Sequence, residues 1–379
     1  MSSKHPRLAL PALLVLASCS PASDHGPTQD ASPMPDARVA DAAAPDAADD
    51  SGPALGCDPS STTLPKDVFC TGLYKDRDPT RHPESVQPYT PGVTLWSDGA
   101  EKQRYLQLPP GAQIDTSQMD AWKFPVGTKA WKEFRFDGKL VETRIFWKTS
   151  DTHWESGTYI WDAANTSATL NEDRKPVILP SGYEIPTARD CGKCHHGGSD
   201  QLLGVEAVAL ALPSAQGVTL AGLSAAHSLS APPATASVTL PEDATGKAGA
   251  ALGYLHANCG MPCHSARGLG DETQLVLRLR ADEFWPSDAG TAPVAAESTD
   301  AYRATVNQAP TTASVAQAFP GALRISPGSH EQSLLWQLTH RRGNYQMPPL
   351  VTHKIDDVGT QKIADWIDAL SPSAPMPAP

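Results

Sequence analysis

Two short motifs combine a pair of cysteines with a histidine that directly follows the second cysteine. The first motif comprises Cys191, Cys194 and His195, and the second motif comprises Cys259, Cys263 and His264. The C-x-x-C-H spacing of the first motif is that of covalent c-type haem attachment, in which the thiols bind the porphyrin and the imidazole binds the iron. The second motif is one residue longer. Together the two motifs predict two covalent haems of the c type.

Two other uses of these four cysteines stay open at this point. Paired cysteines two to four residues apart also suit a four-thiolate zinc site, and thiols in an oxidising compartment form disulfides. Neither alternative explains why a histidine follows the second cysteine in both motifs. The extra residue of the second motif, Met261 or Pro262, is expected to bulge outward without moving Cys263 relative to His264.

Met347 is the predicted distal ligand of the second haem. A thioether is a soft ligand that raises the reduction potential of the iron relative to two histidines. Pro348 and Pro349 follow it, and their fixed φ angles stiffen the loop that presents the sulfur. The alternative is that Met347 fills a gap in the core.

The sequence offers the first haem no equivalent methionine loop. His227 and His256 are the first candidates for its distal ligand, with His153 and Met119 behind them. The alternative is an open sixth position, which would let the iron bind peroxide or small gases.

Residues 1–19 predict an export signal that ends in a lipid anchor. A positively charged start precedes an apolar run, residues 8–16, that is too short to cross a bilayer. The run ends in LASC, which resembles a bacterial lipobox with Cys19 as the lipidated residue. Ser20 follows, and by similarity to such lipoproteins it favours the outer membrane, on its periplasmic side or at the cell surface. The alternative is an ordinary cleaved signal.

Residues 20–56 predict a disordered tether, because they are rich in Ala, Pro, Asp and Ser and contain no aromatic residue. They hold seven Asp and one Arg, so their charge of −6 is half of the chain's −12. The rest of the chain is only mildly acidic, which argues against nucleic-acid binding through a basic face.

Cys57 and Cys70 are the two cysteines that neither the anchor nor the motifs use. In an oxidising compartment they are expected to form a disulfide, which would stabilise the fold by about 2–4 kcal/mol. Two unpaired structural thiols are the alternative.

The pattern of residues 57–180 predicts an antiparallel β domain, expected as a sandwich. Alternate residues from 141 to 147 are apolar or β-branched, as in a half-buried strand, and a turn signal, Asp137-Gly138, precedes them. The tryptophans of this region belong to the core or line a sugar-binding groove.

Mostly helical haem domains are expected after the β domain, which makes the fold class α+β. Residues 181–242 form the first haem segment, with Thr187 as N-cap of the helix that bears the first motif and a second helix over 202–212. Residues 243–370 form the C-terminal domain, and 371–379 a disordered tail.

The C-terminal domain is expected to begin and end with an amphipathic helix. Leu252 and Leu255 give an apolar face to the helix that enters the second motif. The closing helix has one face formed by residues at i, i+3, i+4 and i+7, namely Ile363, Trp366, Ile367 and Leu370.

Four stretches resemble a bacterial family of exported diheme c-type cytochromes. They are residues 95–102 (LWSDGAEK), 185–195, 254–259 (YLHANC) and 343–350 (GNYQMPPL). The likeness covers most of residues 90–370 and implies haem c and electron transfer. The C-terminal domain also resembles mono-domain cytochrome c, in which a haem-bearing helix, a methionine loop and a closing helix follow one another.

The expected function is therefore electron relay by a lipid-anchored diheme cytochrome between redox partner proteins. An enzyme, either a diheme peroxidase or an oxidase with one open haem, is the first alternative. A zinc-stabilised, tryptophan-rich lipoprotein that binds sugars or surfaces is the second.

Overall fold

The computed structural model describes residues 56–372 apart from 59, 174, 196–199, 201, 267 and 286–293. The predicted signal with Cys19, nearly all of the tether and residues 373–379 lie outside the described residues. Among the described helices, none is long and apolar enough to cross a membrane.

A seven-stranded antiparallel sheet forms the first half of the described chain. Its strand order is β6-β5-β4-β3-β2-β1-β9. The strands are β1 (Gln87–Thr90), β2 (Glu101–Gln107), β3 (Lys129–Phe136), β4 (Lys139–Ser150), β5 (His153–Trp161), β6 (Ala168–Leu170) and β9 (Gln216–Gly217). A minor two-stranded sheet contains β7 (Val177–Ile178) and β8 (Glu184–Ile185). The expected combination of an antiparallel sheet with helices, an α+β fold, is confirmed.

The β3–β4 hairpin turns at the Asp137-Gly138 pair that the sequence indicated. Asp137 and Gly138 both have positive φ, 50° and 73°, as the tight hairpin turn favoured by Asp-Gly requires. The strands themselves are buried on both faces, because Glu142 and Phe146 are buried as well as Thr143. The alternation had predicted only one buried face.

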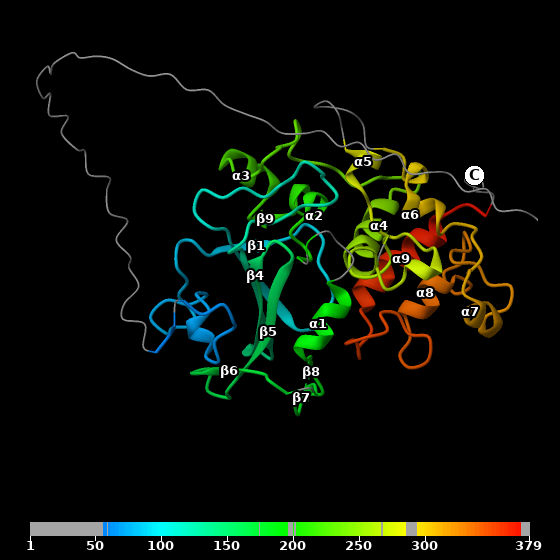
Figure 1. The fold of residues 1–379 in the computed structure, drawn as a ribbon. Coiled ribbons are helices and arrows are strands. Elements are labelled where there is room, and N and C mark those ends of the chain that lie inside the picture. The colour runs from blue at the N-terminus through cyan, green and yellow to red at the C-terminus, as the bar shows by residue number, and fades with distance from the viewer. Residues whose placement is uncertain are drawn as a thin grey trace, which may run out of the picture. The chain divides into compact units, whose positions relative to one another are not determined.

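The sheet packs against different structures on its two faces. Tyr105, Trp131 and Ile145 pack against an N-terminal segment that includes the short 3-10 helix Val68–Cys70. The alternate residues of the same strands, such as Leu106 and Phe146, belong to a larger core shared with the helices. Figure 1 shows the N-terminal segment in blue and helices α4, α8 and α9 on opposite sides of the sheet.

The expected sandwich is therefore wrong for the part of the chain that the structure describes. Helices and an N-terminal segment cover the main sheet, and the only other sheet described is the small β7–β8 ribbon. Period-two alternation identifies a strand with a buried face, but it does not say what covers that face.

Cys57 and Cys70 form a disulfide at the start of the N-terminal segment, with Cα atoms 5.3 Å apart.

The remaining helices and strands of the described chain are mostly short helices. They are α1 (Ala188–Cys194), α2 (Ala207–Ala211), α3 (Leu220–Ala225), α4 (Ala248–Leu255), α5 (Ala281–Phe284), α6 (Asp300–Arg303), α7 (Ala313–Ala318), α8 (Leu334–Thr339) and α9 (Asp357–Ala369), with the π-helix η2 (His256–Gly260) directly after α4. The helix expected over 202–212 is shorter, because the Glu206 carboxylate caps α2 by accepting the N–H groups of Val208 and Ala209.

Helices α4 and α9 enclose the C-terminal core. Leu252 and Leu255 of α4 are fully buried, and so are Ile363 and Trp366 of α9. The predicted apolar faces of both helices therefore pack into the core that also reaches the sheet. The indole N–H of Trp366 donates to Asp243 at 2.8 Å, which satisfies the polar atom of this buried ring.

Candidate functional site

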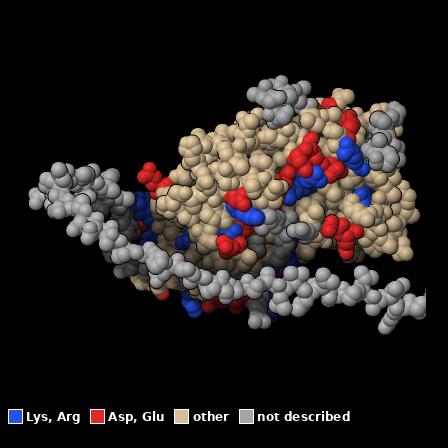
Figure 2. Space-filling view, turned by 45° about the horizontal axis from the view of Figure 1, so that its top comes forward, with Lys and Arg blue, Asp and Glu red and all other residues tan. Residues whose placement is uncertain are grey.

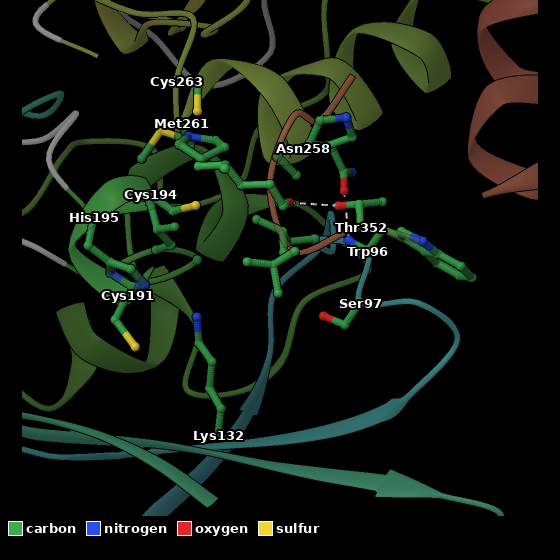
Figure 3. Close-up of a pocket in the computed structure, with 18 of the residues that line it drawn as sticks. Trp96, Ser97, Lys132, Cys191, Cys194, His195, Asn258, Met261, Cys263 and Thr352 are labelled. Carbon is green, nitrogen blue, oxygen red and sulfur yellow. Dashed lines mark hydrogen bonds between the residues drawn. The ribbon is translucent and has the colours of Figure 1, made fainter. Parts of the chain in front are cut away.

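The first motif, together with Cys263 and His264 of the second, lines one cavity of about 390 Å³, which is within the size range of cofactor sites. Cys259 is buried and is not among the residues that line this cavity. One side of the cavity is the helix-facing surface of the sheet, and the others are α1, the second motif and the loop after α8. Figure 3 shows Cys194 directed into this space and Lys132 reaching up from β3 toward the cysteines of α1.

Helix α1 presents the first motif to the cavity. The helix begins after Thr187, whose N–H and hydroxyl both donate to the Asp190 carboxylate, at 3.1 and 2.8 Å. It ends at Cys194, and the N–H of the following residue, His195, donates to the Cys191 carbonyl at 3.2 Å. The buried His195 ring stacks on Phe146 of the sheet, with ring centroids 4.2 Å apart.

The extra residue of the second motif is taken up by a wider helical turn. The Met261 N–H donates to the His256 carbonyl, and the His264 N–H donates to the Cys259 carbonyl, at 2.8 and 2.7 Å. Both bonds span five residues, as in a π-helix, which commonly accommodates one inserted residue. The expected outward bulge is therefore wrong, since Met261 is only 9% exposed and lines the cavity.

The first cysteine and the histidine are joined in both motifs by a backbone hydrogen bond. In the first motif the bond spans four residues, and in the second it spans five. The two spacings therefore reach similar local geometry through an α-type and a π-type turn.

The imidazole of His264 is held in the neutral form. Burial, and then the nearby Arg324 guanidinium, lower the pKa of His264 to about 4. Its Nδ1 lies 3.3 Å from the Thr273 hydroxyl. Gly270 allows this close packing, because a Cβ there would lie 2.6 Å from Nδ1.

The four motif thiols are free in the structure, and burial keeps them protonated. Burial raises the pKa of Cys259 to about 12, and burial is also the largest cause that raises the pKa of Cys263 to about 11. Among the described residues, no three His, Cys, Asp or Glu side chains gather as metal ligands. The four cysteines thus do not form the compact thiolate cluster of a zinc site.

Met347 lines the same cavity and is partly buried. Its N–H donates to the Leu338 carbonyl at 2.8 Å, which attaches the methionine loop to the end of α8. The loop is also bound from the sheet side, because the Asp98 carboxylate accepts the N–H groups of His353 and Lys354.

The two histidines predicted as distal ligands lie in different surroundings. His227 is exposed at the end of α3 and is not part of the cavity wall. His256 lines the cavity, but its Nδ1 accepts the Leu279 N–H at 3.0 Å and its Nε2 faces Glu206 at 3.3 Å. Both ring nitrogens of His256 are therefore already used, so the structure places neither histidine as a ligand.

A row of three cations on the sheet was not anticipated from the sequence. Arg104 of β2 lies directly opposite Lys132 of β3, which lies directly opposite Arg144 of β4. All three line the cavity, and we call them the cation ladder. Burial, followed by the charges of the two arginines, lowers the pKa of Lys132 to about 7. Strand register brings these residues together, and no local sequence pattern reveals it.

The segment before β2 connects the sheet to the second motif. The Asn258 side chain accepts the Trp96 N–H at 2.7 Å and donates to the Thr94 carbonyl at 3.1 Å. Trp96 and Asn258 belong to two of the stretches that carried the family resemblance. Their role is to hold η2 against the sheet.

Comparisons of the chain with protein-family models, with curated proteins and with solved structures give no match. The case for the site therefore depends on its residues and their geometry.

Proposed function

We propose that the chain is an exported, lipid-anchored cytochrome that relays electrons through two covalently attached c-type haems. The observation that carries this proposal is the convergence of both motifs and Met347 on one cavity. The meeting of motifs that lie far apart in the sequence supports a shared cofactor site.

The residues of the cavity fit such a cofactor. A neutral imidazole is the form that binds a metal, and the pKa of His264, lowered to about 4, keeps the ring neutral at physiological pH. The contact of its Nδ1 with Thr273 leaves Nε2 as the coordinating nitrogen. A zinc site is less favoured, because the described thiols are not clustered.

A bound haem supplies an iron centre that takes up and releases one electron, at a potential set by its ligands and surroundings. The chain fixes the cofactor through its thiols, orients His195 on Phe146 and excludes water with the surrounding core. In this proposal Met347 is the distal ligand of the second haem and raises its potential.

The order of the C-terminal elements also supports the proposal. Helix α4 and η2 carry the second motif, the Met347 loop follows α8, and α9 closes the core. This order is that of the mono-domain cytochrome c plan. Helices α5 to α7 are additional to that plan and lengthen the chain between the second motif and Met347. The helical part of the chain is thus proposed to be cytochrome c-like.

An open first haem is the second candidate, and it would add binding of peroxide or small gases. It is favoured because neither predicted histidine is placed as a ligand: His227 is exposed and both nitrogens of His256 are used. No catalytic acid or base is assigned to such a reaction, so electron relay stays the leading function.

The proposed location is the periplasmic side of the outer membrane or the cell surface, with Cys19 as the lipid anchor. The proposed partners are redox proteins. On the face drawn in Figure 2, acidic and basic side chains form mixed groups between large uncharged areas, and no broad basic surface is visible there.

The test is haem stoichiometry and the reduced-minus-oxidised spectrum of the exported protein. We expect two haems per chain by pyridine haemochrome assay. A double Cys→Ser variant of either motif should retain one haem, and variants of both motifs none. A chain that carries no covalent haem and shows no α-band would refute the proposal, whereas a high-spin ferric component would favour the open-haem candidate.

A further inference from the structure

The cation ladder places like charges next to one another on one sheet face. Arg104, Lys132 and Arg144 are direct cross-strand neighbours, and like charges in such positions destabilise a sheet. Arg104 is only 6% exposed. The arrangement therefore needs negative charge nearby.

The described residues supply that charge to only one member of the ladder. Arg144 makes two hydrogen bonds to the Glu142 carboxylate, at 2.6 and 2.9 Å. The side chains of Arg104 and Lys132 donate no hydrogen bond to, and form no ion pair with, any residue that the structure describes. Both side chains instead extend into the cavity.

Most carboxylates of the cavity wall are bound elsewhere. Asp98 accepts backbone N–H groups of the methionine loop, Asp190 caps α1, Asp356 caps α9, Glu206 caps α2, and Glu184 lies 3.3 Å from His353. Glu272 also lines the cavity, but it lies on the 3-10 helix beside the second motif rather than on the sheet. The described cavity wall thus offers Arg104 and Lys132 no carboxylate as an ion-pair partner.

We propose that the cation ladder binds the propionate carboxylates of a haem held in this cavity. This inference rests on the proposed function, because the carboxylates belong to that cofactor. Guanidinium groups match carboxylates with two parallel hydrogen bonds, and a lysine adds a point charge. The β sheet would then be part of the haem site, since it supplies the counter-charge that the helical motifs lack.

The proposal predicts how the ladder sets the reduction potential. Positive charge beside a haem favours the reduced iron, so loss of two ladder charges should disfavour reduction. We expect the double variant Arg104→Gln, Lys132→Gln to keep both covalent haems and to lower the reduction equilibrium constant of one of them about tenfold, or about 59 mV for a one-electron couple.

The dependence of that potential on pH distinguishes direct contact between the ladder and the propionates from a long-range effect of the ladder's charges on the iron. In the wild-type protein the cations keep the propionates ionised, and bound propionates in turn keep Lys132 protonated, because opposite charges favour the ionised forms of both groups. The potential should therefore be constant between about pH 5 and 8. In the double variant, a propionate pKa rises into this range and the potential becomes pH-dependent. Arg104→Lys keeps the charge and should retain most of the wild-type potential.

Arg135→Gln is the matched control. Arg135 is also on β3, but it faces the opposite side of the sheet and lies 3.7 Å from Glu133. It should leave both potentials unchanged. If the double variant does not fold, the two single variants are measured in the same way.

Each contrary outcome has a distinct meaning. If both haems are attached and their potentials do not change in the ladder variants, the ladder does not bind the propionates, while the proposed function stands. Wild-type potentials that shift with added phosphate at constant ionic strength would show that a free anion occupies the ladder, which also overturns it. A chain without covalent haem would overturn the proposed function and this inference together.

Discussion

The His195 imidazole lies nearly parallel to the Phe146 ring, with 24° between the two planes and 4.2 Å between the centroids. One ring ends the first motif and the other belongs to β4, so the sheet fixes the orientation of a proposed iron ligand. Phe146 therefore acts through His195 as a positioning residue.

Replacing Phe146 by Leu should cost about 1–3 kcal/mol of unfolding free energy and should broaden the ligand-field spectrum of the first haem. The ring that packs against His195 is lost, so the imidazole samples several orientations. Phe124→Leu is the control, because Phe124 is equally buried in the same core and its ring contacts Trp154. It should cost similar stability without a spectral change; equal spectra in both variants would contradict the positioning role.

Met347→Ala should abolish the weak charge-transfer absorption expected of methionine bound to ferric iron and should lower the potential of the second haem. The attachment of both haems should survive, because the thiols are untouched. The measurement is redox potentiometry with optical detection. Met347→Leu separates the alternatives: a methionine that only packs would tolerate Leu at a cost below about 1.5 kcal/mol, with spectrum and potential unchanged.

Glu206 should make the fold sensitive to acid. Burial raises the pKa of Glu206, but hydrogen bonds from His256 and the Ala209 N–H outweigh burial and lower the pKa below the ordinary value of 4.5. A lowered folded-state pKa means that the native state binds fewer protons than the unfolded state. The contribution of the ionised Glu206 carboxylate to stability is thus fully present above about pH 4.5, and it is lost as the pH falls through the folded-state pKa.

The Glu206→Gln variant tests this dependence by thermal unfolding from pH 3 to 7. We expect lower stability at neutral pH, by about 1.5–3 kcal/mol for hydrogen bonds to a buried charge, and a shallower loss in acid. Glu101→Gln, at an exposed site on β2, serves as the control. An acid profile of Glu206→Gln that parallels the wild type would disprove the assignment.

Replacing Cys19 by Ser should release the protein from the membrane, because Cys19 is the predicted lipidation site. Fractionation of cells after a salt wash measures the change. Ser18→Ala keeps a small residue before the cysteine and should stay bound. Retention of the Cys19→Ser protein in the membrane fraction would show that the anchor lies elsewhere.

The sequence predicted the parts of the fold that depend on local patterns. Apolar spacing located β4 and α9, and the Asp137-Gly138 pair located the hairpin turn. The sequence did not predict what covers the sheet, because burial of a strand face does not identify its partner. Helix α2 was overestimated, since an apolar run does not reveal that Glu206 caps it late.

Part of the candidate site could likewise be predicted from the sequence, and part could not. The cysteines, histidines and Met347 that face the cavity are recognisable from type and spacing. The cation ladder is not, because Arg104, Lys132 and Arg144 become neighbours only through strand register. The partners of the two His256 ring nitrogens could not be predicted either, since the Leu279 N–H and the Glu206 carboxylate lie far from His256 in the sequence.

The bonds from Asp98 to His353 and Lys354 join residues 255 and 256 positions apart. Contacts of such long range form late in folding, because chain entropy opposes closing a large loop before other contacts reward it. The hairpins of the sheet can pair early, whereas this wall of the cavity is completed only after the methionine loop arrives. Under the proposed function, late closure of this wall would leave the motif thiols reachable during folding, and it would provide an interval in which a bulky group can be attached inside a space that later closes.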